Sequence, residues 1–112
     1  MLIHKAQEHA ANPAPVFAAL GDVTRLSLIR KLSDGQSRSI AKLSADTSLT
    51  RQAVTKHLRV LEIVGLVSST RVGRESQFAF RSEPLAEVWS YLNDVSWQWD
   101  DALSRLRLLV ER

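Results

Sequence analysis

The sequence predicts a mostly α-helical fold that carries one small β-hairpin and ends in a long helix. Three patterns support this: apolar residues at helical spacing before Gly65, alternating residues around a glycine-containing tip between 66 and 81, and a return of helical spacing after Pro84. With 112 residues, 45% hydrophobic and 24% charged, the chain has the size and composition of one globular domain. We therefore expect residues 1–112 to form a single domain.

Two helices are predicted in the first third of the chain. The first covers residues 15–20 and ends at Gly21. Asp22 can cap the second, because its side-chain oxygen can accept a hydrogen bond from a free backbone N–H, and Gly35 ends that helix. Apolar residues of the second helix recur every three positions, which suggests its inward side, and they are Val23, Leu26, Ile29 and Leu32.

Two further helices predict a helix-turn-helix over about residues 39–64. Ser39 precedes a short helix that should stop near Asp46 and Thr47, and a compact turn follows at residues 47–49. Thr50 can cap the next helix, and Gly65 ends it. This helix has the clearest buried stripe in the chain, at the i, i+4, i+7 spacing, formed by Val54, Leu58 and Leu61.

The last part of the chain predicts a hairpin followed by one long helix. Residues 67–71 and 76–80 read as strands around a tip that contains Gly73, so we expect a wing over about 66–81. A helix over about 84–111 spans ~42 Å, whereas a chain of this size has a radius of gyration of only ~13 Å. Residues 93–96 could kink this helix. The apolar stripe of the helix comprises Leu85, Val88, Leu92, Val95, Trp99, Leu103, Leu106 and Val110.

A stripe of that length needs an apolar partner along all of it. Since the helix should extend beyond its own domain, a second copy of the chain can cover the remainder, which predicts a symmetric dimer.

Charge is distributed unevenly along the chain. Residues 47–74 hold five cationic side chains and one acid, whereas residues 82–112 hold six acids and three arginines. On the helix that begins after Thr50, the side opposite the buried stripe carries Gln52, Lys56, Arg59 and Ile63. Three of these side chains, Gln52, Lys56 and Arg59, can donate hydrogen bonds to base edges and phosphates. We therefore expect DNA contacts from this helix and the wing, through Thr50, Arg51, Gln52, Thr55, Lys56, Arg59, Arg71 and Arg74.

The same region resembles a known family. Residues 20–26 (LGDVTRL), 51–61 (RQAVTKHLRVL), 65–67 (GLV) and 72–74 (VGR), in this order, are similar to the ArsR/SmtB family of bacterial winged-helix repressors. The resemblance covers residues 16–81. It implies a homodimer that binds an inverted-repeat operator and blocks transcription. It also implies that the first and last helices make the subunit contact, which adds Val16, Phe17 and Trp89 to the stripe above.

No metal or other cofactor is expected. Metal-sensing members of the family carry Cys-Val-Cys-Asp-Leu in the third helix, where residues 39–43 of this chain read Ser-Ile-Ala-Lys-Leu, and the chain has no cysteine. Others bind zinc through Asp and His in the last helix, yet no histidine follows His57. His4 and His9 are five residues apart, a poor spacing for one helical face, and His57 is expected to be structural.

Other classes of function were weighed against a DNA-binding regulator. Asp100 and Asp101 diverge on a helix and cannot act as an acid–base pair, and no activated nucleophile is visible, so we expect no enzyme. A winged-helix module that binds a protein and has no operator is the alternative. A small-molecule effector stays open: Trp89, Trp97 and Trp99 could line a pocket at the dimer seam or form dimer core alone.

The chain has neither a membrane-spanning run of ~18 apolar residues nor a recognisable secretory signal, which predicts a cytoplasmic protein that does not bind a membrane.

Overall fold

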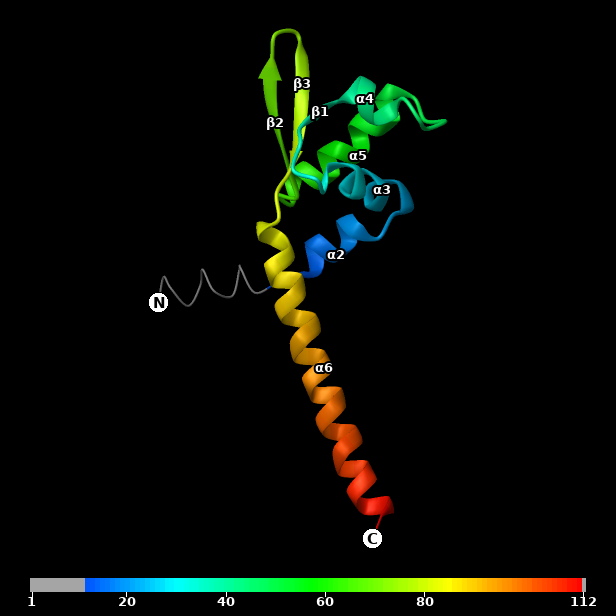
Figure 1. Ribbon diagram of the computed structural model, residues 1–112, viewed down its shortest axis with the longest axis vertical. Helices are drawn as coiled ribbons and strands as arrows, with labels where there is room; N and C mark the ends of the chain where they lie inside the picture. Colours follow the sequence, from blue (N-terminus) through cyan, green and yellow to red (C-terminus); the bar gives the residue numbers. More distant parts are fainter. Residues whose placement is uncertain (1–11, 112) are drawn as a thin grey trace, which may run out of the picture.

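The computed structural model describes residues 12–111, and that range contains five helices and three short strands (Figure 1). The helices before the sheet pack into one body with it, while the last helix leaves that body and extends alone (Figure 1). The predicted fold class, mostly α with a small hairpin and a long final helix, is confirmed. In chain order the elements are α2 (Ala14–Leu20), α3 (Val23–Leu32), β1 (Arg38–Ser39), α4 (Ile40–Ser44), α5 (Arg51–Ile63), β2 (Val67–Val72), β3 (Glu75–Phe80) and α6 (Glu83–Val110).

Side-chain caps begin three of the helices. Asp22 Oδ2 accepts from the Arg25 N–H at 3.0 Å at the start of α3, and Thr50 Oγ1 accepts from the Ala53 N–H at 3.1 Å at the start of α5, as predicted. Ser39 caps α4 in the same way. Each cap satisfies an N–H that the first turn of a helix leaves without a partner.

The short helix α4 ends earlier than predicted. It stops at Ser44 rather than near Asp46 and Thr47, so five residues, 45–49, separate it from the cap Thr50 instead of the expected three. The reason is local: both the backbone N–H and the hydroxyl of Thr47 donate to the Ser44 carbonyl, which closes a turn in place of another helical step.

The inward side of α3 differs from the prediction. Leu28 and Leu32 are buried, whereas Val23 is 84% exposed and Leu26 is 50% exposed. Residues three apart on a helix are separated by roughly 300°, which is about 60° short of a full turn. Over the three steps from Val23 to Leu32 this difference adds up to about 180°, so the two side chains lie on opposite sides of α3. The i, i+4 pair, rather than the three-residue recurrence, marks the buried side.

The sheet is antiparallel in the order β1-β3-β2. Pairing of β2 with β3 forms the predicted hairpin, in which Val72 faces Glu75 across a two-residue loop. Gly73 has a φ of +63° there, a value that suits glycine in tight hairpin turns. β1 was not predicted, because two polar residues carry no alternating pattern that could identify a strand.

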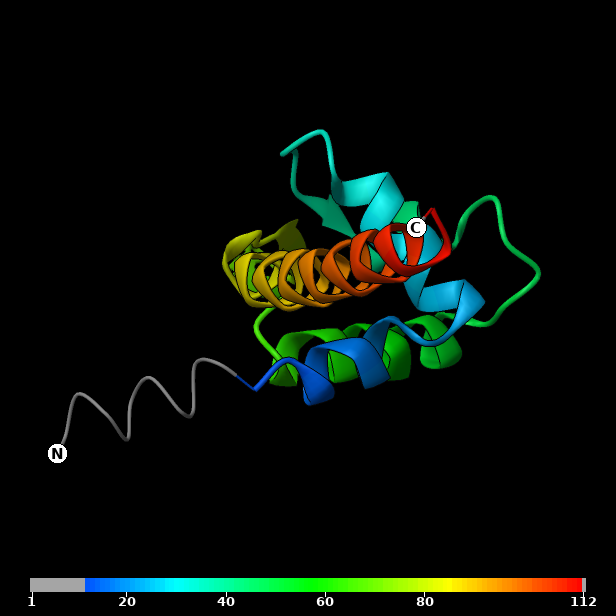
Figure 2. The ribbon, with the colours of Figure 1, turned by 90° about the horizontal axis from the view of Figure 1, so that it is seen from below.

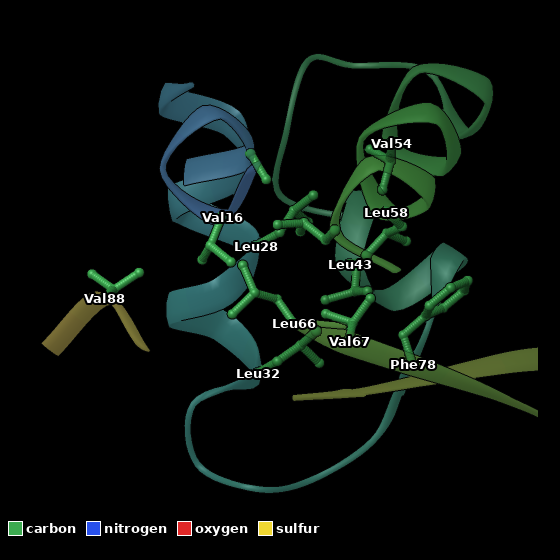
Figure 3. Packing of buried hydrophobic residues seen from close by; sticks show 12 residues of the cluster. Val16, Leu28, Leu32, Leu43, Val54, Leu58, Leu66, Val67, Phe78 and Val88 are labelled. Carbon is green, nitrogen blue, oxygen red and sulfur yellow. The ribbon is translucent and has the colours of Figure 1, made fainter. Parts of the chain in front are cut away.

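One apolar core joins the helices to the base of the sheet. In Figure 3, side chains from α2, α3, α5 and β2 point toward one another, and Val88 of α6 reaches the cluster from its margin. The predicted stripe of α5 lies at the centre of this core, with Val54, Leu58 and Leu61 fully buried. The orientation of α5 is thereby set, and its opposite side faces solvent.

The long helix α6 runs without interruption through residues 93–96, so the kink considered there is absent. It lies against the body only near its start, where Leu85 and Val88 meet the core. The described chain measures 68 × 40 × 21 Å with a radius of gyration of 18.8 Å, well above the ~13 Å of a compact chain of this length. Figure 2, which looks up along the molecule from below, shows α6 projecting toward the viewer from the other helices.

Within residues 12–111, no helix combines the length and hydropathy that crossing a bilayer requires.

Candidate nucleic-acid interface

The exposed side of α5 carries the side chains that the helical wheel assigned to it. Arg51, Gln52, Lys56, Arg59 and Ile63 are all exposed, whereas the buried stripe on the opposite side has no exposed surface. The core therefore presents a polar, hydrogen-bonding helix side to solvent, and the location of that side was correctly predicted.

A groove of about 740 Å³ lies where this side of α5 meets the start of α4 and the end of the hairpin. Its wall brings together five of the eight residues predicted to contact DNA, from two segments that are about twenty residues apart in the chain. These elements lie at the end of the molecule opposite the C-terminal end of α6 (Figure 1). The five residues are Arg51, Gln52, Thr55, Lys56 and Arg74.

The cationic side chains of this groove have no partners within residues 12–111. The side chains of Arg51, Lys56 and Arg74 take part in none of the hydrogen bonds or ion pairs found there, although the backbone carbonyl of Arg51 accepts from the Thr55 hydroxyl. By contrast, Lys31 pairs with Asp46 at 2.5 Å and Arg38 pairs with Asp34 at 2.6 Å. Cations without a protein partner remain available for an anionic ligand.

Three carboxylates outside the groove, Asp22, Asp34 and Asp46, have hydrogen-bonding partners of their own. The Lys31 ammonium lowers the pKa of the Asp46 carboxyl below its usual range, and the Arg38 guanidinium does the same for Asp34. Asp22 caps α3, and the Arg25 N–H that donates to its carboxylate lowers the pKa of Asp22. These carboxylates stay charged at neutral pH but are paired, so they offset little of the positive field of the groove.

Three of the predicted residues lie outside the groove wall. Thr50 caps α5 through its hydroxyl, which gives it a structural task as well. Arg59 is exposed beside Glu62, with 3.4 Å between Nη1 and Oε1, and Glu62 also accepts from the Ser69 hydroxyl of β2. Arg71 lies on β2 opposite Ser76 and is exposed.

Five groove residues were missed by sequence reasoning. Ser39 caps α4, and Ile40 and Ala41 follow it; Glu75 and Ser76 begin β3. Glu75 and Ser76 follow the predicted contact residue Arg74 directly, and this position was their only available signal. Ser39, Ile40 and Ala41 are not adjacent in the sequence to any predicted contact residue, so the sequence offered no signal for them. Apolar side chains at this edge can contact a thymine methyl group, and a carboxylate can accept from the cytosine amino group.

The predicted dimer face is open in the single chain. Leu85 and Val88 of the α6 stripe, with Val16 and Phe17 of α2, pack against the core of the body. Val95 is half-buried, while the other members of the stripe, together with Trp89, are 49–77% exposed. Trp97, which is 68% exposed, lies on the opposite side of α6 from the stripe. A continuous exposed apolar face of this extent is typical of an interface.

The two histidines considered for metal binding, His4 and His9, lie outside the described residues. Within 12–111, no three His, Asp or Glu side chains come together in a way that could hold a metal ion. Ser39 and Ala41 stand at the start of α4, where Ser39 acts as a helix cap. Neither side chain can supply the thiolate that metal-sensing relatives place there.

Comparison with known proteins identifies the family. The family model described as bacterial regulatory protein, arsR family, matches residues 22–69, which span α3 to the start of β2. The HTH-type transcriptional regulator YuzN of Bacillus subtilis is 41% identical over 83 residues, covering 69% of this chain and 90% of YuzN. The chain belongs to the ArsR family.

Solved structures agree with this assignment. An ArsR-like transcriptional regulator from Rhodococcus sp. RHA1 superimposes with a TM-score of 0.74 at 33% identity, covering 92% of this chain and 95% of the other. The winged helix-turn-helix DNA-binding domain of Mb0332 from Mycobacterium bovis, a homodimer in solution, has a TM-score of 0.59 at 24% identity, with 74% and 76% covered. At that identity, Mb0332 supports the fold alone.

This ArsR-family chain is a transcriptional regulator with a winged helix-turn-helix DNA-binding domain, in which α4 and α5 form the helix-turn-helix and β2 and β3 form the wing. The expectations of family, winged-helix fold and a regulator rather than an enzyme are confirmed by the relatives.

Proposed function

We propose that the protein is a homodimeric repressor that binds an inverted-repeat operator, with α5 in the major groove and the wing beside it. Residues 1–112 act as one DNA-binding domain. The protein works in the cytoplasm, where the chromosome of a bacterial regulator lies. The DNA contacts are those of the exposed α5 side and the wing: Thr50, Arg51, Gln52, Thr55, Lys56, Arg59, Arg71 and Arg74.

The groove at the end of the molecule is the observation that carries this proposal. Gln52 stands in it between the cations of Arg51 and Lys56, which have no side-chain partner among residues 12–111, and Arg74 lines the same groove from the wing. Cations contact phosphates and fix the register, while an amide can make two hydrogen bonds with an adenine edge. The arrangement therefore supplies both affinity and a means of reading sequence.

The open face of α6 supports the homodimer. A second copy packed on this face by two-fold symmetry presents a second α5 on the same side of the assembly. Two reading helices about 34 Å apart fit successive major grooves on one face of a duplex, and the two-fold symmetry requires an inverted repeat. The homodimer reported for Mb0332 is in line with this model. Repression follows where such a site overlaps a promoter.

Selection of duplexes from a random-sequence pool by the purified protein tests the proposal. We expect an enriched inverted repeat, bound as a dimer, whose log affinity falls with log salt concentration by roughly 5 to 9 units per unit, since three to five cations per subunit meet phosphates. Absence of enrichment together with a slope near zero would reject the proposal and leave a protein-binding winged helix as the alternative. A promoter fusion that is silenced in cells only when it carries the enriched site tests repression itself.

A further inference from the structure

The side chain of Arg25 joins three helices. From the first turn of α3, its Nε donates to the Ala19 carbonyl at 2.5 Å and its Nη2 donates to the Ala18 carbonyl at 3.4 Å, both at the end of α2. Its own backbone N–H donates to the cap residue Asp22. The guanidinium is thus held against the end of α2, with one nitrogen, Nη1, left for another partner.

That partner is His57 of α5, whose Nδ1 lies 3.2 Å from Arg25 Nη1. A guanidinium has no acceptor atom, so the imidazole must accept at Nδ1, and the neutral ring carries its proton on Nε2. The Asp22 carboxylate, 3.7 Å from the same ring nitrogen, offsets the charge of the guanidinium. His57 is half-buried, as expected for the structural histidine that the sequence suggested.

This contact has no counterpart between these helices. Among residues 12–111, it is the only side-chain hydrogen bond that joins α5 to α2 or α3. Apart from the longer approach of Asp22 to His57 at 3.7 Å, these helices are held by apolar packing. Such packing resists small rotations and sliding less strictly than a directional hydrogen bond does. His57 directly follows Lys56 of the groove, so the angle of its ring about the α5 axis also sets the angle of Lys56 and Gln52.

We propose that Arg25 is a positioning residue for DNA recognition, which acts through His57 to set the orientation of α5 relative to α2. The inference rests on the proposed function, because α2 lies beside the dimer face and α5 is the reading helix. In a dimer both reading helices must meet their half-sites at once. A misoriented α5 therefore weakens operator binding at both half-sites. Contacts with phosphates on random DNA tolerate it, since these contacts carry no sequence information.

The test compares two replacements of His57 in the full chain. His57→Leu removes the acceptor, while His57→Asn places an amide oxygen close to the position of Nδ1 and so keeps it. With the duplex selected by the wild type, we expect His57→Leu to lose at least about tenfold in affinity, because each of the two subunits loses a hydrogen bond to a charged group, and His57→Asn to stay within about threefold. Affinity for random duplex should stay within about twofold for both.

A double-mutant cycle assigns the effect to the pair. Arg25→Gln alone should also weaken operator binding, and adding His57→Leu to it should cost much less than His57→Leu does in the wild type. Sedimentation and circular dichroism confirm that each variant is a folded dimer. If Arg25→Gln does not fold, the comparison of the two His57 variants decides the question by itself.

The possible failures are distinguishable. A wild type that selects no duplex would overturn the proposed function and this inference together. A selecting wild type whose His57→Leu variant binds the operator unchanged, or loses operator and random DNA equally, would overturn the positioning role of Arg25 and leave the proposed function intact.

Discussion

The ring of Phe17 in α2 meets the ring of Tyr91 in α6 edge-on, with centroids 5.7 Å apart and planes at 73°. This aromatic contact, together with Leu85 and Val88, attaches the first half of α6 to the body. The second half has no such attachment within the described chain, and its apolar residues stay exposed. The structure of the chain thus divides α6 into an anchored half and an open half.

The first prediction concerns the open half of α6. Leu106 and Leu108 are 57% and 66% exposed in the single chain, but they lie roughly 160° apart around the helix, and only Leu106 belongs to the stripe. Leu106→Glu should raise the dissociation constant of the dimer by about two orders of magnitude, because a carboxylate without a partner would be buried in the interface. Sedimentation equilibrium measures this.

Leu108→Glu is the matched control and should leave the dimer intact. If the two variants had the same dimer dissociation constant, whether both weakened the dimer or neither did, the stripe would not be the subunit contact.

The second prediction separates base reading from phosphate contact. Gln52→Ala should cost ~1–3 kcal/mol on the selected operator and leave binding to random duplex nearly unchanged, since it removes a contact with a base edge. Arg74→Ala should weaken both and lower the steepness of the salt dependence by about one unit per subunit. Fluorescence anisotropy over a salt series measures both quantities.

Arg107, exposed near the far end of α6, gives the control, and Arg107→Ala should change neither quantity. The assignment of the groove would be wrong if Gln52→Ala and Arg74→Ala both bound the operator as tightly as the wild type.

The third prediction concerns the single acid in the groove wall. Glu75 is exposed next to Arg74 and has no cationic partner within 4.0 Å among the described residues. Its carboxylate repels phosphates, so Glu75→Gln should strengthen binding to random DNA several-fold at low salt and reduce the ratio of operator to random affinity.

Asp100→Asn on α6 removes the same charge far from the groove and should have a much smaller effect. Equal gains from both variants would attribute the change to net charge rather than to the position of Glu75.

The fourth prediction concerns pH and stability. The Arg38 guanidinium, with help from the Gln36 N–H, holds the pKa of Asp34 well below its usual range. Because the folded-state pKa is lower than the unfolded-state value of about 3.9, this pair contributes stability above that pH and loses it as the pH falls further. Asp34→Asn should therefore be less stable than the wild type at pH 7, and the difference should shrink between about pH 5 and pH 2.

Urea unfolding at several pH values measures the difference, which should be modest because the pair is partly exposed. A constant difference between Asp34→Asn and the wild type at all pH values would mean that the ion pair contributes nothing to stability.

Sequence reasoning succeeded where the signal is local. The cap at Thr50, the stripe of Val54, Leu58 and Leu61, and the stop at Gly65 lie within one helix, and each follows from backbone hydrogen bonding or helical spacing. It failed where the pattern was ambiguous, as for the three-residue recurrence in α3, or too short to see, as for β1.

The sequence by itself determined the elements, the polar side of α5 and the excess length of α6, because these depend on periodicity, caps and chain length. Only the tertiary structure decided which residues share the groove, since Glu75 and Ser39 meet Gln52 through the packing of a sheet edge on two helices. The link between Arg25 and His57, 32 residues apart, was likewise decided there. No local pattern encodes such contacts, because they arise from the directions in which separate elements leave one core.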